Sequence, residues 1–422
     1  MKVLVIGGGG REHAVCMKLK ESKLVDALLC APGNAGIAQM AKCVPGVKAT
    51  DVEAIVKLAK DEQVDFVCVT PDDPLALGCV DALEAAGIAA FGPSAYAAQM
   101  ESSKIFSKNL MKKYGIPTAA SETFEDMDEA LAYLDTQKAP IVVKADGLAL
   151  GKGVIVAQTM EEAKAAVVDM MQGGRFGKSG ARVLIEECMF GREVTVLCFC
   201  DGKTIVPMRA SQDHKRVFDG DLGPNTGGMG AFAPSPLYTE ELAKRTMEEI
   251  LVPTLQAMNA EGFTFKGVLY VGLMLTEQGP KVVEYNARFG DPETQAVLPL
   301  LDSDLMEIMM AVREQRLSEL DIRWKNQAAA CIVLASGGYP GAYESGKTIT
   351  GLQEAAQAGA TVYHAGTKRS GEDFVTAGGR VLGVTALGDT LKEAVDSAYA
   401  AARNIHFDGV HMRSDIGSKD CK

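Results

Sequence analysis

The sequence predicts a protein of about three domains that combines α/β with α+β architecture. The chain has 422 residues, more than one compact domain usually holds. Its first part alternates apolar strand patterns with helical patterns, which is typical of a doubly wound parallel sheet. Its last part carries strand signals and one longer helical pattern, which predicts a small α+β domain.

The composition limits the classes of function. Hydrophobic residues make up 47% of the chain, and the formal net charge is −12. An acidic balance argues against a nucleic-acid binder or a membrane-surface binder, since both need a basic face. No apolar run is long enough to span a bilayer, and no signal peptide opens the chain. We expect a soluble, cytoplasmic monomer that acts on small molecules.

The ten cysteines do not form metal or disulfide patterns. None of them forms a Cys-x-x-Cys pair, and most lie in apolar runs. We therefore expect buried, reduced thiols, which fits a cytoplasmic protein.

The N-terminal part reads as alternating strands and helices. A buried strand at Lys2–Ile6 is followed by the glycine turn Gly7–Gly10 and by a helix that starts near Arg11. Further strands are expected at Ala27–Cys30, Phe66–Thr70 and Ala89–Phe91. This alternation predicts a doubly wound α/β domain over residues 1–103.

The glycine turn does not match a dinucleotide site. The fingerprint needs Gly-x-Gly-x-x-Gly, and Glu12 stands at the third glycine position. The second strand ends without an acidic residue for a ribose. A glycine turn at a helix N-terminus can still hold one phosphate, and two such turns, around Gly10 and Gly33, follow strand ends.

A glycine-rich turn is expected in the middle of the chain. Lys104 opens a helix that runs to about Tyr114. Strands at Pro140–Ala145 and Val154–Ala157 then flank a run of glycines. Such a turn is a flap whose backbone N–H groups can cover phosphates, and Lys144 lies on the strand before it. It is not a Walker A loop, because no Gly-Lys-Ser/Thr opens a helix.

The next two segments differ in regularity. A strand is expected at Val183–Cys188. The stretch from Ser211 to Pro236 has little periodicity, and such a stretch inside a compact domain is usually functional or disordered. Its apolar residues argue against disorder. Its His214 has a structural role at least as readily as a catalytic one.

Polar side chains converge at the end of a strand near residue 285. Glu284 and Asn286 are two residues apart in a strand pattern, so they project from one face. Their hard oxygens are ligands suited to Mg²⁺. Arg288 follows on that face and suits a phosphate or carboxylate. Asp291 and Glu293 are expected on a loop after the strand.

The last hundred residues predict a small α+β domain. Gly378–Arg380 could reach a ligand, but a hairpin-type turn is the favoured interpretation, and the tail from Ser414 is expected to fray. The expected strands and helix are Ala328–Ala335, Thr361–His364, Arg380–Ala386 and Thr390–Asn404.

The run Arg288–Gln295 resembles the signature Arg-Phe-Gly-Asp-Pro-Glu-x-Gln of the glycinamide ribonucleotide synthetase (phosphoribosylamine–glycine ligase) family. The resemblance covers essentially the whole chain, with Asp72 in place of a glutamate that is usual in the family. It implies a central ATP-grasp fold over 104–325 with a flap subdomain at about 122–190, and a C-terminal domain over 326–422.

The resemblance also implies roles for individual residues. It places Mg²⁺ or Mn²⁺ on Glu284 and Asn286, and catalysis on Lys144, Asp213 and Arg288. The implied ATP contacts are Lys104, Lys144, Gly147, Gly151, Gly153, Glu186, Glu187, Met189 and Glu193. The implied substrate contacts are Gly10, Arg11, Gly33, Asn34, Asp213, Gly227, Gly228, Arg288 and Asp291.

The implied reaction joins glycine to 5-phosphoribosylamine with ATP, by way of glycyl phosphate. Its products are glycinamide ribonucleotide, ADP and phosphate, in de novo purine (IMP) biosynthesis. Three other interpretations remain to be tested: another ATP-grasp ligase or carboxylase, a dehydrogenase built on the N-terminal sheet, and a non-catalytic nucleotide sensor.

Overall fold

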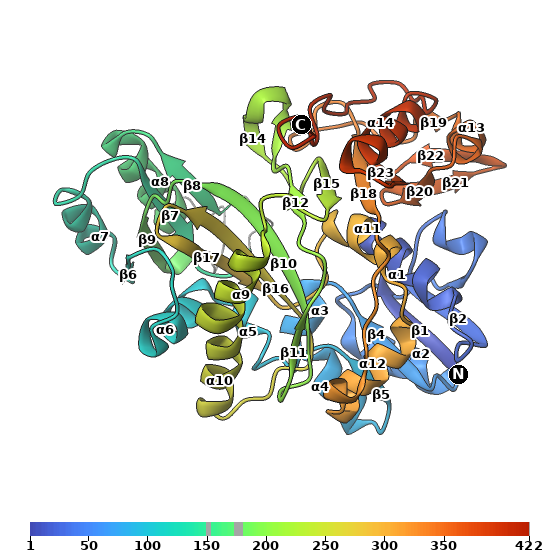
Figure 1. Cartoon of the computed structure of the whole chain (residues 1–422), viewed down its shortest axis with the longest axis horizontal. Coiled ribbons are helices and arrows are strands. Elements are labelled where there is room, and N and C mark those ends of the chain that lie inside the picture. The colour runs from blue at the N-terminus through green and yellow to red at the C-terminus, as the bar shows by residue number, and fades with distance from the viewer. Residues whose placement is uncertain (149–152, 173–179, 422) are drawn as a thin grey trace.

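The computed structural model describes residues 1–148, 153–172 and 180–421 (Figure 1). Its N-terminal part is a five-stranded parallel sheet in the order β3-β2-β1-β4-β5. The doubly wound prediction is confirmed, with one short edge strand, β3, in addition. The elements are β1 (Lys2–Gly7), α1 (Gly10–Lys20), β2 (Ala27–Pro32), β3 (Lys42–Cys43), α2 (Val52–Asp61), β4 (Phe66–Val69), α3 (Asp72–Ala76), α4 (Cys79–Ala85) and β5 (Ala89–Phe91).

Both faces of this sheet are buried, which explains why its strands read as continuous apolar runs. Leu4 and Ile6 of β1 belong to a core shared with α2 and α4. Val3 and Val5 point to the opposite face, where a second core includes α1 and Met306 of α12 (Leu305–Glu314). A helix from much later in the chain therefore covers one face of the N-terminal sheet (Figure 1).

The segment after the N-terminal sheet forms two antiparallel sheets. The flap sheet has the order β6-β9-β7-β8 and packs its core against α7 and α8. The central sheet has the order β11-β10-β16-β17, and α6, α9 and α10 pack against it or one another (Figure 1). The elements are α5 (Gln99–Ser102), α6 (Lys104–Tyr114), β6 (Ser121–Phe124), α7 (Met127–Leu134), β7 (Ile141–Ala145), β8 (Val154–Ala157), α8 (Met160–Gln172), β9 (Val183–Glu187), β10 (Arg192–Cys200), β11 (Ile205–Pro207), α9 (Glu240–Thr246), α10 (Val252–Ala260), β16 (Gly267–Thr276) and β17 (Gly279–Asn286).

The stretch from Ser211 to Pro236 is not irregular, contrary to the expectation from its lack of periodicity. It contains β12 (Gln212–Asp213), β13 (Arg216–Phe218), β14 (Leu222–Asn225) and β15 (Gly230–Ala233). These strands are only two to four residues long. Runs so short cannot show an alternating pattern in the sequence, because alternation needs several repeats.

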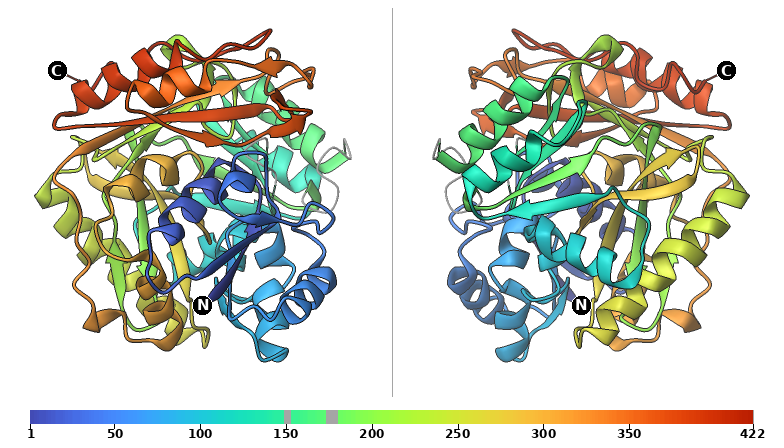
Figure 2. Two further views of the ribbon diagram at one scale, coloured as in Figure 1. Left: turned by 90° about the vertical axis from the view of Figure 1, so that its right-hand side faces the viewer. Right: turned by 90° about the vertical axis from the view of Figure 1, so that its left-hand side faces the viewer.

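The C-terminal sheet has the order β12-β15-β18-β23-β20, so two of its strands come from that earlier stretch. It lies over the rest of the molecule with α14 packed on it (Figure 2). A separate small sheet has the order β19-β22-β21. The remaining elements are α11 (Glu293–Val297), β18 (Ala328–Ala335), β19 (Thr348–Ile349), α13 (Leu352–Gln357), β20 (Thr361–His364), β21 (Thr367–Ser370), β22 (Asp373–Thr376), β23 (Arg380–Gly388) and α14 (Leu391–Ala402). No helix in the described part of the chain is long and apolar enough to cross a membrane.

Two further expectations about the C-terminal part are wrong. Gly378–Arg380 does not close a hairpin, because β22 and β23 belong to different sheets. The tail does not fray at Ser414, since the backbone N–H of Ile416 donates to the Tyr399 hydroxyl at 2.9 Å and the Ile416 side chain is 1% exposed. The tail is held by burial and hydrogen bonds that its polar sequence did not reveal.

Two buried histidines join the N-terminal and C-terminal sheets. The backbone N–H of His364 on β20 donates to Nδ1 of His13 on α1 at 2.8 Å. Burial lowers the pKa of His13 to about 3 and the pKa of His364 to about 4. Both imidazoles are therefore neutral in the folded protein near pH 7.

We predict that the two histidines make stability fall as the pH decreases. The unfolded chain protonates them near pH 6.5, whereas the folded chain resists protonation, so their contribution is complete above pH 6.5 and is lost below it. His364→Gln should reduce this loss by up to about 1.4 kcal/mol per pH unit between about pH 6 and the folded-state pKa. Urea unfolding at several pH values measures it, with His406→Gln, at an exposed histidine, as the control. An unchanged pH dependence in His364→Gln would contradict the prediction.

Candidate active site

A cleft of about 930 Å³ is lined by residues of all three parts of the chain. The N-terminal part contributes Arg11 and Asp72, and the C-terminal part contributes Arg380. Most of the lining comes from the flap sheet and the central sheet, which lie next to each other (Figure 1). The cleft is large enough for a nucleotide and a small acceptor.

Two lysines of this cleft share one buried carboxylate. Glu186 on β9 lies 2.8 Å from Lys108 Nζ and 2.7 Å from Lys144 Nζ, and each of the three side chains is at most 6% exposed. Burial opposes the charge on Glu186, but Lys144 and Lys108 outweigh it and hold the pKa of this carboxyl below its usual range. Lys144 also donates to the carbonyl of Val283 at 3.2 Å. Both ammonium groups are thereby held in fixed positions in the cleft.

A third lysine lies on the same helix as Lys108. Lys104 donates to the carbonyl of Gly147 at 2.7 Å, and burial lowers its pKa in spite of nearby Glu284. Gly147 and Gly153 line the cleft at the two ends of the flap turn. Gly151 lies outside the described residues. One end of the flap turn thus contacts a cleft lysine directly, as expected for a loop that covers phosphates.

The polar face of β17 lies beside these lysines, since Lys144 donates to the carbonyl of Val283 on this strand. Glu284 and Asn286 both line the cleft, as their two-residue spacing predicted. Lys215 Nζ lies 3.8 Å from Glu284 and 3.0 Å from Glu193 on β10. Burial raises the pKa of the neighbouring Asp213 to about 7, although Lys215 opposes the shift.

The donor set at Glu284 and Asn286 fits a divalent cation that arrives with a nucleotide. It supplies one carboxylate and one amide oxygen, and in the described part of the chain no three His, Cys, Asp or Glu side chains converge on a metal site. Mg²⁺ is commonly held by one or two protein oxygens, with phosphate and water as the other ligands. The residues therefore suit this mode of binding and not a closed protein cage.

Arg288 is held by the carboxylate of Glu101 on α5, the helix that precedes α6. Its Nη2 lies 2.9 Å from Oε1 of Glu101, whose Oε2 also accepts from the backbone N–H of Ala287 at 2.8 Å. The Nε of Arg288 is buried and has no hydrogen-bond partner among the described residues. One face of the guanidinium is thus fixed, and the residue lines the cleft, where a guanidinium suits a phosphate or carboxylate.

The signature after Arg288 ties the cleft to the C-terminal sheet. Asp291 Oδ2 lies 3.1 Å from Arg380 Nη2, and Arg380 Nη1 donates to the carbonyls of Gly227 at 2.6 Å and Asp291 at 2.7 Å. Gly228 has φ +115°, and a Cβ there would lie 2.4 Å from Pro292. Glu293 does not lie on a loop as expected, because it begins α11 and is 3% exposed.

The predicted substrate contacts of the N-terminal part differ in whether they line the cleft. Arg11 lines the cleft and donates to the carbonyl of Phe289 at 3.1 Å. Gly10, Gly33 and Asn34 are not among the described residues that line it. The amide of Asn34 instead donates to the carbonyls of Gly8 at 2.9 Å and His364 at 2.7 Å. Their assignment to a substrate remains a prediction.

Most of the other predicted residues do line the cleft. They are Lys104, Lys144, Gly147, Gly153, Glu186, Glu187, Met189, Glu193, Asp213, Gly227, Glu284, Asn286, Arg288 and Asp291. No role was predicted for Lys108 or Glu101. Lys215 was noted only as part of the stretch from Ser211 to Pro236, and Arg380 was expected in a hairpin-type turn in preference to a ligand contact. Lys108 could have been found, because it follows Lys104 by four residues and shares its helix face. The other three carry no local signal.

The family comparisons agree with this geometry over the whole chain. Models of the phosphoribosylglycinamide synthetase family match in three parts, the N domain at residues 1–101, the ATP-grasp (A) domain at 102–294 and the C domain at 329–419. The chain belongs to this family. The predicted family and the predicted ATP-grasp fold are thereby confirmed.

Relatives and solved structures support the same family. The chain is 51% identical over 420 residues to a phosphoribosylamine–glycine ligase of Escherichia coli strain K12, covering 99% of this chain and 98% of the relative. A crystal structure of the ligase from Thermotoga maritima has 32% identity and a TM-score of 0.86, covering 99% of this chain and 100% of that one. A biotin carboxylase from Campylobacter jejuni has 14% identity and a TM-score of 0.75, covering 100% and 97%, which indicates a shared fold alone.

We predict that Glu186→Gln strongly destabilises this protein. The variant keeps the shape of the side chain but leaves Lys108 and Lys144 as buried cations without their shared counter-charge. The free energy of unfolding should fall by about 3 kcal/mol, as urea unfolding at pH 7 measures. Lys57→Met, which breaks the exposed pair with Asp61, is the control and should cost less than about 1 kcal/mol. Equal losses in the two variants would contradict the prediction.

Proposed function

We propose that this chain joins glycine to 5-phosphoribosylamine at the expense of ATP, giving glycinamide ribonucleotide, ADP and phosphate in de novo purine biosynthesis. The observation that carries the proposal is the position of the Arg288–Gln295 signature. Arg288 and Asp291 of this run face the same cleft as Lys104, Lys144 and Glu284. A signature specific to the family thus lies beside groups suited to phosphates and a cation.

The nucleotide is assigned to the flap side of the cleft. Lys104 and Lys144 carry the charge for the phosphates, and Gly147 and Gly153 let the flap approach them. Glu186 and the segment from Glu187 to Met189 border the adenine, and Glu193 borders the ribose. Because Glu186 also neutralises Lys108 and Lys144, the base and the phosphates are positioned by one connected group of charges.

Glycine must be activated before the amide can form, because its carboxylate oxygens are poor leaving groups. A carboxylate oxygen attacks the γ-phosphorus, ADP leaves, and glycyl phosphate results. The amine of phosphoribosylamine then attacks the carbonyl carbon, and phosphate leaves with the former carboxylate oxygen. A cation held by Glu284 and Asn286 would supply charge neutralisation for the phosphoryl transfer.

The protein residues around glycine bind, orient and exclude water. Arg288, anchored by Glu101, is assigned to the migrating phosphoryl group. Asp213, Gly227, Gly228 and Asp291 are assigned to glycine and the amine substrate. We assign the phosphate of phosphoribosylamine to the Arg11 side of the cleft, with Gly10, Gly33 and Asn34 shaping the turns behind it. Closure of the flap would protect glycyl phosphate from hydrolysis.

The proposal also includes the cation, the assembly and the compartment. We propose Mg²⁺ or Mn²⁺ as the cation, a monomeric enzyme that binds no nucleic acid, and a cytoplasmic location. The ten unpaired cysteines support a reducing compartment.

An omission assay separates this proposal from the other ATP-dependent alternatives. ADP release is measured with ATP, glycine and phosphoribosylamine, and each substrate is omitted in turn. The proposal requires all three for turnover. Turnover with another acceptor would favour a different ATP-grasp ligase, and ATP binding without turnover would favour a sensor. An NAD titration tests the dehydrogenase.

We predict that Glu284→Ala lowers activity more than about 100-fold, since a direct metal ligand matters at least as much as its supporting partners. Asn286→Ala should have a smaller effect in the same direction, because an amide oxygen carries no net charge. Excess Mg²⁺ should partly restore Asn286→Ala. Glu277→Ala, at an exposed glutamate of the same hairpin, is the control. Normal turnover of Glu284→Ala at limiting Mg²⁺ would show that the metal assignment is wrong.

We predict that glycine is the substrate that becomes phosphorylated. With ¹⁸O in the glycine carboxylate, each turnover should transfer one labelled oxygen to the released phosphate. Mass spectrometry of the phosphate measures the transfer, and ¹⁸O-labelled water with unlabelled glycine is the control. Phosphate without label would rule out glycyl phosphate, even if the overall reaction is as proposed.

A further inference from the structure

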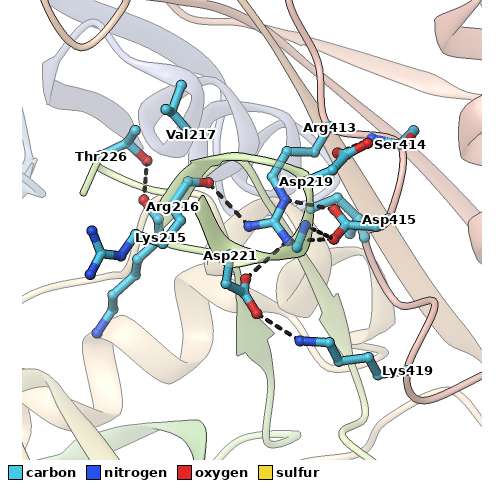
Figure 3. Close-up of polar contacts among 12 residues, drawn as sticks. Lys215, Arg216, Val217, Asp219, Asp221, Thr226, Arg413, Ser414, Asp415 and Lys419 are labelled. Carbon is cyan, nitrogen blue, oxygen red and sulfur yellow. Dashed lines mark hydrogen bonds and ion pairs between the residues drawn. The ribbon is translucent and has the colours of Figure 1, made fainter. Parts of the chain in front are cut away.

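A fully buried arginine fastens the C-terminal tail to the β13–β14 hairpin. The Arg413 side chain is 1% exposed, and its Nε and Nη2 bind the two oxygens of Asp415 at 2.7 and 2.9 Å. The same guanidinium reaches Asp221 at 3.0 Å and the carbonyl of Arg216 at 3.1 Å (Figure 3). One cation thus joins the tail to the first strand of the hairpin and to its turn. Such a buried charge is stable only while its partners stay in place.

The turn of the hairpin, residues 219–221, binds the tail at each of its positions. Asp219 Oδ1 accepts from the backbone N–H of Ser414 at 2.8 Å, and the N–H of Gly220 donates to Asp415 at 2.8 Å. Lys419 Nζ lies 2.7 Å from Asp221 (Figure 3). The hairpin is therefore anchored along its whole turn and not at one point.

The far end of the tail reaches the central sheet. Arg192 Nη2 at the start of β10 donates to both oxygens of Asp420, at 2.7 and 2.9 Å. The Asp420 side chain is 4% exposed although it lies close to the chain end. Lys419, Asp420 and Arg192 all line the cleft. The tail thus spans the distance between the hairpin and the strand that carries Glu193.

The residue just before the hairpin is held inside the cleft. Lys215 precedes Arg216, and its carbonyl accepts from both the N–H and the hydroxyl of Thr226 at 2.7 Å. Its Nζ lies 3.0 Å from Glu193 and 3.8 Å from Glu284. The backbone beside Lys215 is therefore pinned, while its ammonium bridges the carboxylates of two central strands.

We propose that the tail, residues 413–420, is a positioning element of the nucleotide site. It holds the hairpin against β10, and the hairpin in turn holds Lys215 between Glu193 and Glu284. The proposal rests on the assignment of this cleft to ATP. It assigns to the tail a contribution to ATP affinity, although the tail itself need not touch the nucleotide.

The test reverses the charges of the Arg192–Asp420 pair. Arg192→Asp and Asp420→Arg, made singly, place like charges together and should each weaken ATP binding about five- to tenfold, as expected for the loss of a charge-assisted pair. The double variant restores the pair in reverse and should return the Kd for ATP to within about twofold of the original. Calorimetric titration of the full chain with ATP and Mg²⁺ measures the Kd.

Hydrogen exchange over residues 216–225 provides a readout besides affinity. The single variants should exchange faster there, and the double variant should recover. Reversal of an exposed pair in the same domain, Lys392–Asp396, is the matched control and should change neither value. If Asp420→Arg does not fold, a chain ending at Ser418 removes the Arg192–Asp420 pair together with the Lys419–Asp221 pair, and it should show at least the same loss of affinity and faster exchange.

Two results would overturn the proposal. Unchanged ATP affinity in the single variants, whatever their thermal stability, would show that the tail supports the fold without contributing to ATP binding. Failure of the double variant to recover, with Arg192→Asp far weaker than Asp420→Arg, would mean that Arg192 contacts ATP itself. Because the titration omits glycine and phosphoribosylamine, neither result depends on the acceptor assigned above, which the omission assay tests separately.

Discussion

Two ion pairs made by one short segment hold the cleft together. Arg288 pairs with Glu101 from the end of the N-terminal part, and Asp291 pairs with Arg380 from the C-terminal sheet. These residues flank Phe289, whose carbonyl also accepts from Arg11 of the N-terminal part. The segment therefore meets every other part of the chain at one place. A change in any of these contacts would shift the walls of the cleft relative to one another.

The cost of burying charge explains why the site is built from linked pairs. An isolated buried ammonium or carboxylate is strongly disfavoured, so each one needs a partner of opposite charge. Lys108 and Lys144 share Glu186, and Lys215 lies between Glu193 and Glu284. The lining of the cleft therefore mixes lysines and arginines with a similar number of carboxylates. The charge that a polyanion such as ATP meets then depends on where the individual ammonium and guanidinium groups lie and not on an excess of cations.

The C-terminal part contributes to this site more than its separation in sequence suggests. Its sheet takes β12 and β15 from the middle of the chain, so the strand that carries Asp213 pairs within the C-terminal sheet. Arg380 begins β23 of the same sheet and reaches the carbonyl of Gly227. The division expected at residue 325 therefore separates segments that form one sheet.

The sequence by itself determined the features that depend on neighbouring residues. The apolar runs of β1, β2, β4 and β5 predicted the parallel sheet, because a strand buried on both faces must be apolar throughout. The Glu284–Asn286 spacing predicted two oxygens on one face, and the contiguous signature Arg288–Gln295 predicted the family.

Only the tertiary structure decided which charges meet. Glu101 with Arg288, Glu186 with Lys108, Arg380 with Asp291 and Arg413 with Asp221 are partners from distant parts of the chain. An ion pair depends on distance in space and leaves no periodic trace in the sequence, so neither partner identifies the other. The anchored tail escaped prediction for the same reason, and the strands β12–β15 did so because they are too short to show an alternating pattern. They are stabilised by what they pack against and not by their own residues.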